Sequence, residues 1–195
     1  MHHIVAGLWM AAGLLSSWDW VSPSPSTLAE VAQERADGVI VASGKPLGFL
    51  ASRASYRNYR MHVEWRWTEK PGNSGVLLHI VGGPKDGAWP LSQQVQTKFG
   101  FAGDLLSMAG ASFNEPLTSA PGTTRIKART GANSEKPAGE WNSTDIVCRD
   151  GSIEVSVNGV PQNRVTGASP DSGRVGIQFE GTPFELRRIE ITPLD

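Results

Sequence analysis

The nine residues YRMHVEWRW, at positions 59–67, alternate between large uncharged and charged or imidazole side chains. Strict alternation over this length indicates a β-strand with one face on a core and one face outside it. The core face would carry Tyr59, Met61, Val63, Trp65 and Trp67. Five large side chains on one face need an apolar layer above them, so this stretch predicts a strand packed inside a layered β protein.

Working outward, the same period recurs between turn signals. Residues 143–160, STDIVCRDGSIEVSVNGV, contain two strand patterns around Asp150-Gly151, a favoured two-residue hairpin turn. Residues 92–99 and 174–180 also alternate, whereas Pro, Gly and Ser collect in 108–140 and predict a long excursion there. Thr27 is a candidate cap for one helical turn in LAEVAQER. Many short strands predict an all-β fold, a two-sheet antiparallel β-sandwich of jelly-roll type.

The composition limits the function classes. The chain has 195 residues, a formal net charge of −1 and 39% hydrophobic residues, which fits one domain with a substantial core. A nucleic-acid surface would need clustered excess Lys and Arg, so the charge balance argues against one. The single cysteine, Cys148, lies in a strand pattern and is expected to be a buried small hydrophobe.

The first residues allow two interpretations. Ile4 to Leu15 is apolar apart from its glycines, about the length of a signal-peptide core, but no Lys or Arg precedes it. Residues 1–16 are therefore a signal peptide or an ordinary first strand, and residues 17–195 form the predicted domain. The stretch is too short to cross a bilayer as a helix, which needs about 20 residues, so no transmembrane span is expected.

The faces opposite the predicted core carry long polar side chains. Three strands contribute pairs of them: Glu64 with Arg66, Gln94 with Gln96, and Gln178 with Glu180. If these strands were neighbours, the side chains would line a polar groove. The alternative interpretation is an ordinary solvated sheet face.

The stretch NSGVLLHI, residues 73–80, combines a turn with an apolar strand that contains a histidine. Asn73 and Ser74 before Gly75 are typical turn residues, so Asn73 sets the turn or contacts a ligand. Simple alternation puts Val76, Leu78 and Ile80 on the core face and His79 on the opposite face. His79 is thus predicted either to project toward the polar groove or to pack with a backbone carbonyl as its partner.

Several segments in one collinear order resemble a known family. They are GVIVASGKPLGFLAS, YRNYRMHVEWRW, KPGNSGVLLHI, the QVQ and AGD segments, KPAGEWNSTDIVCRDGSIEVSVNGV and GRVGIQFEGTPFELRRIEI. Together they resemble the 3-keto-disaccharide hydrolase domain, and the resemblance covers roughly residues 17–195. The resemblance implies a concanavalin-like jelly roll that acts on glycosides oxidised to a ketone at sugar carbon 3. It also implies a bacterial exported or cell-envelope protein, periplasmic or secreted, and a separate sugar 3-dehydrogenase that makes the substrate; a cytoplasmic location stays open.

One position departs from the family pattern. The family usually has an acidic residue in the strand where this chain has Gln94, within Gln94-Val95-Gln96. Glutamine keeps the size and hydrogen-bonding capacity of glutamate but is neither a base nor a good metal ligand. The alternative function, from a different class, is therefore a carbohydrate-binding jelly-roll module without catalysis.

The implied chemistry is elimination followed by hydration, with direct hydrolysis as the other route. A ketone at carbon 3 acidifies the proton on carbon 2, so a base forms an enolate and the group on carbon 1 leaves. This route needs a base, a group that stabilises the ketone oxygen and an acid at the leaving oxygen. It does not need the paired carboxylates of ordinary glycosidases.

On this hypothesis the candidate catalytic residues are His79, Glu64 and Glu180. The same three side chains are a chemically sensible set for a divalent cation, although no compact metal motif is present. The other interpretation makes Glu180 and Arg66 an exposed carboxylate and its ion-pair partner. The candidate substrate-binding residues are Arg66, Asn73, Gln94, Gln96, Gln178, Trp89 and Trp141. The two tryptophans either stack on sugar faces or belong to the core.

Overall fold

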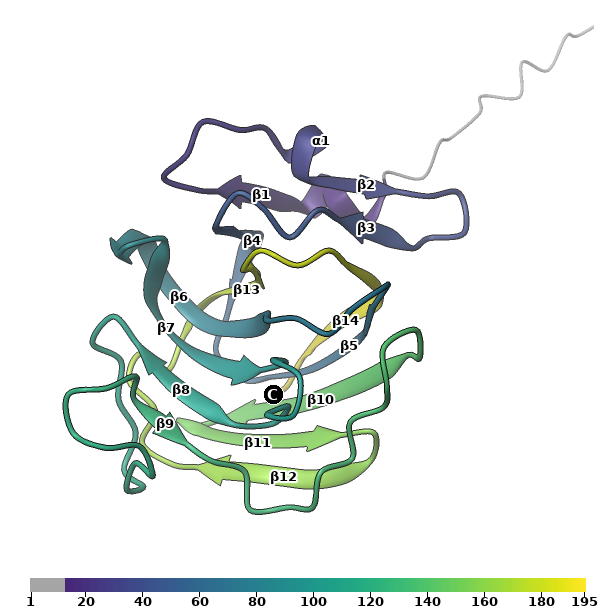
Figure 1. Cartoon of the computed structure of the whole chain (residues 1–195). Coiled ribbons are helices and arrows are strands. Elements are labelled where there is room, and N and C mark those ends of the chain that lie inside the picture. Colours follow the sequence, from purple (N-terminus) through teal and green to yellow (C-terminus); the bar gives the residue numbers. More distant parts are fainter. Residues whose placement is uncertain (1–12) are drawn as a thin grey trace, which may run out of the picture.

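Two seven-stranded antiparallel sheets form the body of the protein, as the computed structural model of residues 13–195 shows (Figure 1). Sheet A has the strand order β1-β4-β13-β6-β7-β8-β9, and sheet B has the order β12-β11-β10-β5-β14-β3-β2. In both sheets the central strands pair with partners that are distant in sequence, β13 with β4 and β6, and β5 with β10 and β14, as in a jelly roll. The predicted all-β sandwich is confirmed.

The elements have the following bounds. Sheet A contains β1 (Trp18–Val21), β4 (Gly48–Tyr56), β13 (Gly173–Phe179), β6 (Gly75–Asp86), β7 (Trp89–Gln96), β8 (Leu105–Met108) and β9 (Ile126–Lys127). Sheet B contains β12 (Val160–Val165), β11 (Ser152–Val157), β10 (Asn142–Arg149), β5 (Tyr59–Trp67), β14 (Phe184–Pro193), β3 (Ile40–Ala42) and β2 (Ala32–Glu34). The two helical turns are the 3-10 turn η1 (Leu14–Ser17) and α1 (Leu28–Val31).

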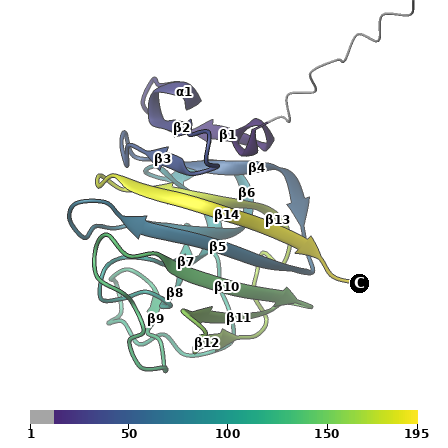
Figure 2. The ribbon, with the colours of Figure 1, turned by 90° about the vertical axis from the view of Figure 1, so that its right-hand side faces the viewer.

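Strand β5 lies at the centre of sheet B, between β10 and β14 (Figure 2). Its five alternate large residues are all nearly inaccessible to solvent and belong to the core between the sheets. The core is completed from sheet A by Val76, Leu78, Val95, Val175, Ile177 and Phe179. Alternation in β5 thus correctly predicts which face is buried, because a sandwich strand has only one core face.

The local turn predictions are also confirmed. Asp150 (φ 49°) and Gly151 (φ 74°) connect β10 to β11, and both have the left-handed backbone that this hairpin turn requires. Thr27 and Glu30 form a capping box at the start of α1. Cys148 is buried in the core, as expected.

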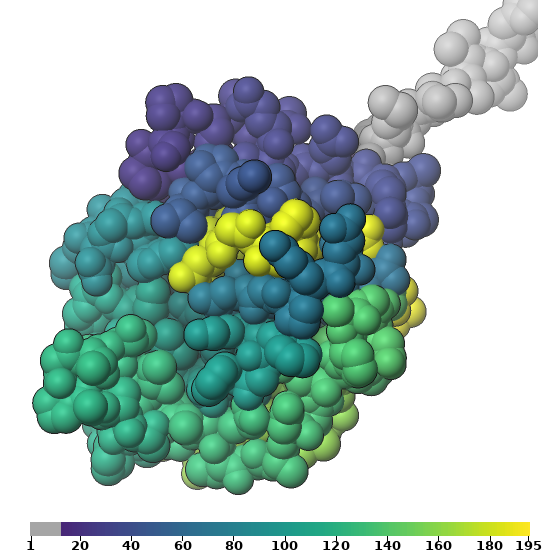
Figure 3. Space-filling model, viewed as in Figure 1, coloured from purple at the N-terminus to yellow at the C-terminus, as the bar shows by residue number. Residues whose placement is uncertain are grey.

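The long excursion between β8 and β10 contains only the two-residue strand β9. The N-terminal elements lie at one end of the sandwich, and green residues of the excursion lie at the other (Figure 3). The prediction of a signal peptide or first strand in residues 1–16 falls largely outside the described residues. Among residues 13–195, no helix is long and apolar enough to span a membrane.

Candidate functional site

A groove of about 900 Å³ lies on the outer face of sheet A. Residues of β6, β7, β8 and β13 and of the loops beside them line it. Its volume is within the range of about 300–1,000 Å³ that is typical of small-ligand sites. From the site residues predicted by sequence, the groove collects Asn73, Trp89, Gln94, Gln96, Gln178 and Glu180.

Three glutamine amides form a cluster in the groove. The Gln94 Nε2 group donates to Gln96 Oε1 at 3.1 Å and to Gln178 Oε1 at 3.0 Å. The oxygen of Gln94 is buried and has no hydrogen-bond partner. A buried acceptor without a partner is rare and costly, and this one belongs to a residue that lines the groove.

The amide cluster depends on Gly75. Gly75 lies opposite Gln96 on the neighbouring strand, and Ser74 beside it donates its hydroxyl proton to the Gln178 carbonyl at 2.6 Å. A Cβ on Gly75 would lie 2.4 Å from Gln94 Nε2 and 2.7 Å from Gln94 Cδ. The missing side chain therefore makes the space that the Gln94 amide occupies.

The next row along the groove contains a carboxyl group and a cation. Backbone hydrogen bonds from Thr97 to Ser74 and from Phe99 to Gly72 continue the β6–β7 pairing, so that Asn73 and Lys98 lie side by side. Glu180 follows β13 and also lines the groove, with Asn73 and Lys98. Burial raises the pKa of Glu180 above its ordinary value, although the charge of Lys98 and the side chain of Asn73 lower it. A carboxyl group with a raised pKa that also feels the charge of a nearby lysine is suited to proton transfer.

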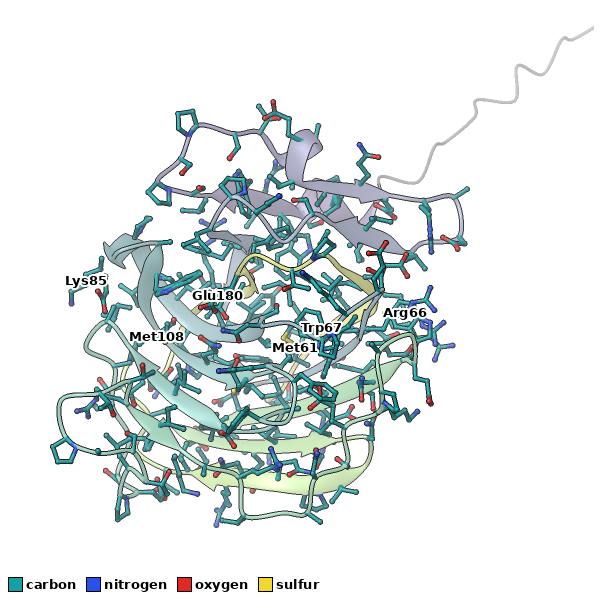
Figure 4. The ribbon with its side chains drawn as sticks, viewed as in Figure 1. Met61, Arg66, Trp67, Lys85, Met108 and Glu180 are labelled. Atoms are coloured by element: carbon teal, nitrogen blue, oxygen red, sulfur yellow. The ribbon has the colours of Figure 1, made fainter. Side chains whose placement is uncertain are left out.

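The opposite end of the groove begins at Trp89. Since β7 rises about 3.3 Å per residue, Trp89 lies roughly 23 Å from Gln96. Lys85, Met108 and Arg125 also line the groove. The sticks of Lys85, Met108 and Glu180 lie on the same side of the molecule, and Arg66 lies on the other side (Figure 4). The groove is thus an elongated site with amides and a carboxyl group at one end and a tryptophan at the other.

His79 does not line the groove, so the predicted convergence on that residue is wrong. Its side chain is 1% exposed, and its ring packs edge-on against Tyr59 of the opposite sheet, with centroids 5.7 Å apart. His79 has φ 55°, and the β6–β7 register shifts between Leu78 and Val81. This irregularity breaks the alternation: His79 points into the core, whereas Ile80 packs with Leu77 in a separate apolar cluster.

The surroundings of His79 favour the neutral ring. Burial lowers its pKa, opposed by the Gln93 side chain, by Asp171 and by the Pro170 carbonyl. Its Nδ1 atom lies 3.3 Å from Gln93 Oε1, and its Nε2 atom has no partner. His79 is therefore packed, as one interpretation predicted, but its hydrogen-bond partner is the Gln93 side chain instead of a backbone carbonyl.

Glu64 and Arg66 lie on the outer face of sheet B, so their predicted place in the groove is also wrong. Glu64 forms ion pairs with Arg187 and, at 3.0 Å, with Arg188. Arg66 pairs with Glu185 at 2.6 Å. β5 belongs to the opposite sheet from β6, β7 and β13, and sequence alternation alone does not reveal this separation.

Trp141 also lies outside the groove, beside these ion pairs. The guanidinium groups of Arg66 and Arg187 lie 4.6 Å and 4.1 Å from the centroid of its ring. Trp141 therefore stacks on arginines of sheet B in this structure. Of the two tryptophans predicted to bind sugar, only Trp89 lines the groove.

The candidate cation set does not assemble. Glu64 lies on the outer face of sheet B, His79 lies in the core, and Glu180 lies in the groove of sheet A. Residues 13–195 contain no cluster of three or more His, Cys, Asp or Glu side chains placed to hold a metal ion.

Comparison with known protein families identifies the family of this chain. The sequence model of the 3-keto-alpha-glucoside-1,2-lyase-like domain matches residues 13–192. The chain belongs to this family. The match confirms the resemblance to the 3-keto-disaccharide hydrolase domain. No curated protein sequence matches the chain.

Solved structures similar to this member of the 3-keto-alpha-glucoside-1,2-lyase-like family share its sandwich. A candidate glycosyl hydrolase from Parabacteroides distasonis has 21% identity and a TM-score of 0.65, over 92% of this chain and 89% of the other. The carbohydrate-binding module CBM66 from Bacillus subtilis has 8% identity and a TM-score of 0.62, over 90% and 95%. Alginate lyase A1-II′ has 14% identity and a TM-score of 0.56, over 92% and 96%. At these identities the likeness shows the fold.

Family membership and the jelly-roll fold together make this a carbohydrate-active protein. Lys98 lines the groove but was not among the site residues predicted from sequence. The signal was present, because Lys98 continues the alternation of Gln94 and Gln96 on one face. Arg125 and Met108 had no such signal, since the loop and the short strand that carry them show no period.

Proposed function

We propose that this protein cleaves glycosides oxidised to a ketone at sugar carbon 3, in the groove of sheet A, with Glu180 as the proton-transferring residue. The observation that carries the proposal is the Glu180 carboxyl group, partly buried beside Lys98 and next to the glutamine amides. The family match supports the substrate class.

The residues divide the chemistry between them. The Glu180 carboxylate takes the proton from carbon 2, and Lys98 stabilises the negative charge that develops on the ketone oxygen. The electron pair of the broken C–H bond forms the carbon 1–carbon 2 double bond as the bond from carbon 1 to the leaving oxygen breaks. That oxygen takes a proton from Glu180 or from water. Addition of water to the unsaturated ketone then completes net hydrolysis.

The amides would hold the sugar during this reaction. Gln94 offers a free acceptor, and Gln96 and Gln178 orient the Gln94 amide. Glutamine and asparagine side chains bind hydroxyl groups as both donors and acceptors. Trp89 at the far end is the groove residue suited to stacking on a sugar ring.

The test is incubation of the protein with 3-keto-trehalose or 3-keto-lactose, with release of the leaving sugar followed by chromatography. Turnover by the wild-type protein that is lost in Glu180→Gln supports the proposal. Wild-type turnover that persists in Glu180→Gln would exclude Glu180 as the proton-transferring residue. A transient unsaturated ketone in the reaction would distinguish elimination from direct hydrolysis.

A second candidate function is a carbohydrate-binding module without catalysis. It is favoured by Gln94, an amide in the groove at a position where the family usually has an acid. Binding of unoxidised disaccharide without turnover of either 3-keto-disaccharide would support it. Turnover by Gln94→Glu, in the absence of wild-type turnover, would identify the missing carboxylate as the cause.

The reaction also implies a partner and a location. Because a 3-keto-glycoside arises by oxidation of a sugar hydroxyl group, we propose that a separate sugar 3-dehydrogenase supplies the substrate. We propose a periplasmic or secreted location for the same pathway, as in family members of the bacterial envelope. Fractionation of cells that express the full chain tests the location.

A further inference from the structure

Two exposed phenylalanines lie just beyond the groove, on the loop between β7 and β8. Phe99 is 45% exposed and Phe101 is 51% exposed. They are the two aromatic residues among the exposed large hydrophobic side chains of residues 13–195. Single exposed apolar side chains are common on protein surfaces, so the surroundings of each phenylalanine decide whether it has a role in binding.

The loop that carries them is fixed at its centre, at Gly100. The Gly100 N–H group donates to Glu135 Oε2 at 2.6 Å, and Arg129 Nη1 donates to the Gly100 carbonyl at 2.8 Å. On either side, Phe99 N donates to the Gly72 carbonyl at 3.0 Å and Phe101 N donates to the Lys98 carbonyl at 2.9 Å. The phenylalanines are therefore exposed on an ordered backbone.

Lys98 connects this loop to the reacting end of the groove. Its Nζ atom lies 5.3 Å from the centroid of the Phe101 ring, and the same side chain lines the groove. Its charge also acts on Glu180. Phe101 is thus in contact with a residue that lines the groove together with Glu180.

The position of Glu180 gives Phe101 a role. Glu180 belongs to the last row of the groove, so a substrate whose reacting bond lies beside it extends in two directions. On one side are the three amides, which suit a polar keto sugar. Lys98 lies in the row of Glu180 itself, and on the other side is Phe101, which suits a group with a flat apolar face.

We propose that Phe101 is the subsite for the leaving group, and that it favours leaving groups with a flat apolar face. The aryl group of an aryl glycoside and the C–H face of a pyranose share this chemistry. The inference rests on the proposed function for the location of the reacting bond. Binding of unreactive glycosides tests it separately.

The experiment compares phenyl and methyl glucosides in two forms. Unoxidised glucosides are titrated by calorimetry with wild-type protein, Phe101→Ala, Phe99→Ala, Trp89→Ala and the control Leu47→Ala. Leu47 is 48% exposed and is not part of the groove lining, so its variant controls for loss of an exposed apolar side chain. The corresponding 3-keto-glucosides are then used for KM and kcat. Thermal melting of each variant verifies that the fold is retained.

We expect wild-type protein to bind the phenyl compound more tightly than the methyl compound. Phe101→Ala should reduce that preference about 3- to 10-fold and leave binding of the methyl compound unchanged. The Leu47→Ala variant should bind both compounds as wild-type protein does. A 3-keto-disaccharide is then tested in place of the phenyl compound. If Phe101→Ala also raises its KM, the subsite accepts the face of a pyranose as well as an aryl group.

The inference is overturned if wild-type protein has no phenyl preference, or if Phe101→Ala weakens phenyl and methyl binding equally. A loss of the preference in Trp89→Ala but not in Phe101→Ala would also overturn it, by placing the leaving group at the opposite end. Intact phenyl preference without any turnover would reject the proposed reaction alone.

Discussion

The outer faces of the two sheets carry similar kinds of long polar side chains but use them differently. On sheet B, Glu64 and Glu185 are almost fully paired with arginines. On sheet A, the groove leaves the Gln94 oxygen without a partner and holds Glu180 with a raised pKa. Paired charges on a sheet mainly stabilise the fold, whereas unpaired groups in a groove are available to a ligand.

The first prediction addresses catalysis and has the largest expected effect. Glu180→Gln should lower turnover of a 3-keto-disaccharide by about 10²- to 10⁴-fold, because an amide cannot take up the proton. The matched control is Glu64→Gln, which removes a carboxylate from the outer face of sheet B. It should retain wild-type turnover at a temperature where it is folded. Equal losses of turnover in the two variants would contradict a catalytic role that belongs to the groove of sheet A alone.

The second prediction concerns Glu135, which fixes the loop beside the groove. Burial raises its pKa to about 7, although the Gly100 N–H group, Trp67 and Arg129 lower it. The folded state therefore binds more protons than the unfolded state, and stability falls as pH rises from the unfolded pKa through about 7. Glu135→Gln removes this titration. The free energy of unfolding of the variant minus that of wild type should therefore be larger at pH 8 than at pH 5, by roughly 1 to 3 kcal/mol.

Urea unfolding at the two pH values measures this difference. Glu69→Gln, at an exposed position, serves as its control and should show little change. If the Glu135→Gln variant and wild type lost stability in parallel between pH 5 and pH 8, the Glu135 carboxyl group would not be the titrating group.

The third prediction concerns Glu64 and has the opposite sign of pH dependence. Burial alone would raise the pKa of Glu64, but Arg187 and Arg188 outweigh it and lower that pKa. Its contribution is therefore present above the unfolded pKa and is lost as pH falls through the lowered value. Glu64→Gln should lower the free energy of unfolding by about 1 to 2 kcal/mol at pH 7, since the arginines are partly exposed.

Denaturant unfolding at pH 7 and in acid tests this expectation. The difference in the free energy of unfolding between wild type and Glu64→Gln should become smaller in acid. Glu154→Gln is the comparison within sheet B, because the Glu154–Arg164 pair has side chains 56% and 65% exposed. It should change stability by less than about 0.5 kcal/mol. A larger loss in Glu154→Gln than in Glu64→Gln would contradict the role of burial in the difference.

The fourth prediction concerns the space above Gly75 and has the smallest expected effect. Gly75→Ala should displace the Gln94 amide and weaken binding of 3-keto-trehalose about 3- to 10-fold, the loss of one or two hydrogen bonds. The measurement uses the Glu180→Gln background, so that the sugar is not consumed. Gly83→Ala lies on the same strand with no atom within 4 Å of the new Cβ, and should bind as its parent does.

The fold could be predicted from sequence in strands that have large apolar residues on one face and polar residues on the other. In β5 the alternation of large and charged residues correctly predicted the core face, and Asp150-Gly151 correctly predicted the hairpin. The site was predicted in part: Gln94, Gln96, Gln178 and Glu180 share the groove. Alternation specifies a face within a strand, but it does not specify which of two sheets the strand joins, and Glu64 was misplaced for that reason.

His79 shows the second limit of a sequence pattern. Its position depends on a single left-handed residue inside an apolar strand, where no glycine or proline marks the irregularity. One such residue reverses the faces of everything that follows it in the strand. Tertiary packing against Tyr59 accompanies this conformation, and local sequence carries no sign of that contact.

The place of β13 in sheet A has a consequence for biosynthesis. β13 lies between β4 and β6, although it follows β6 by almost a hundred residues, and it brings Gln178 and Glu180 to the groove. A growing chain therefore has an unfilled gap in sheet A until residues 173–180 have left the ribosome. Such non-local pairing is slow and leaves strand edges exposed meanwhile. Chains that end before residue 173 should lack the groove and depend on chaperones to remain unaggregated.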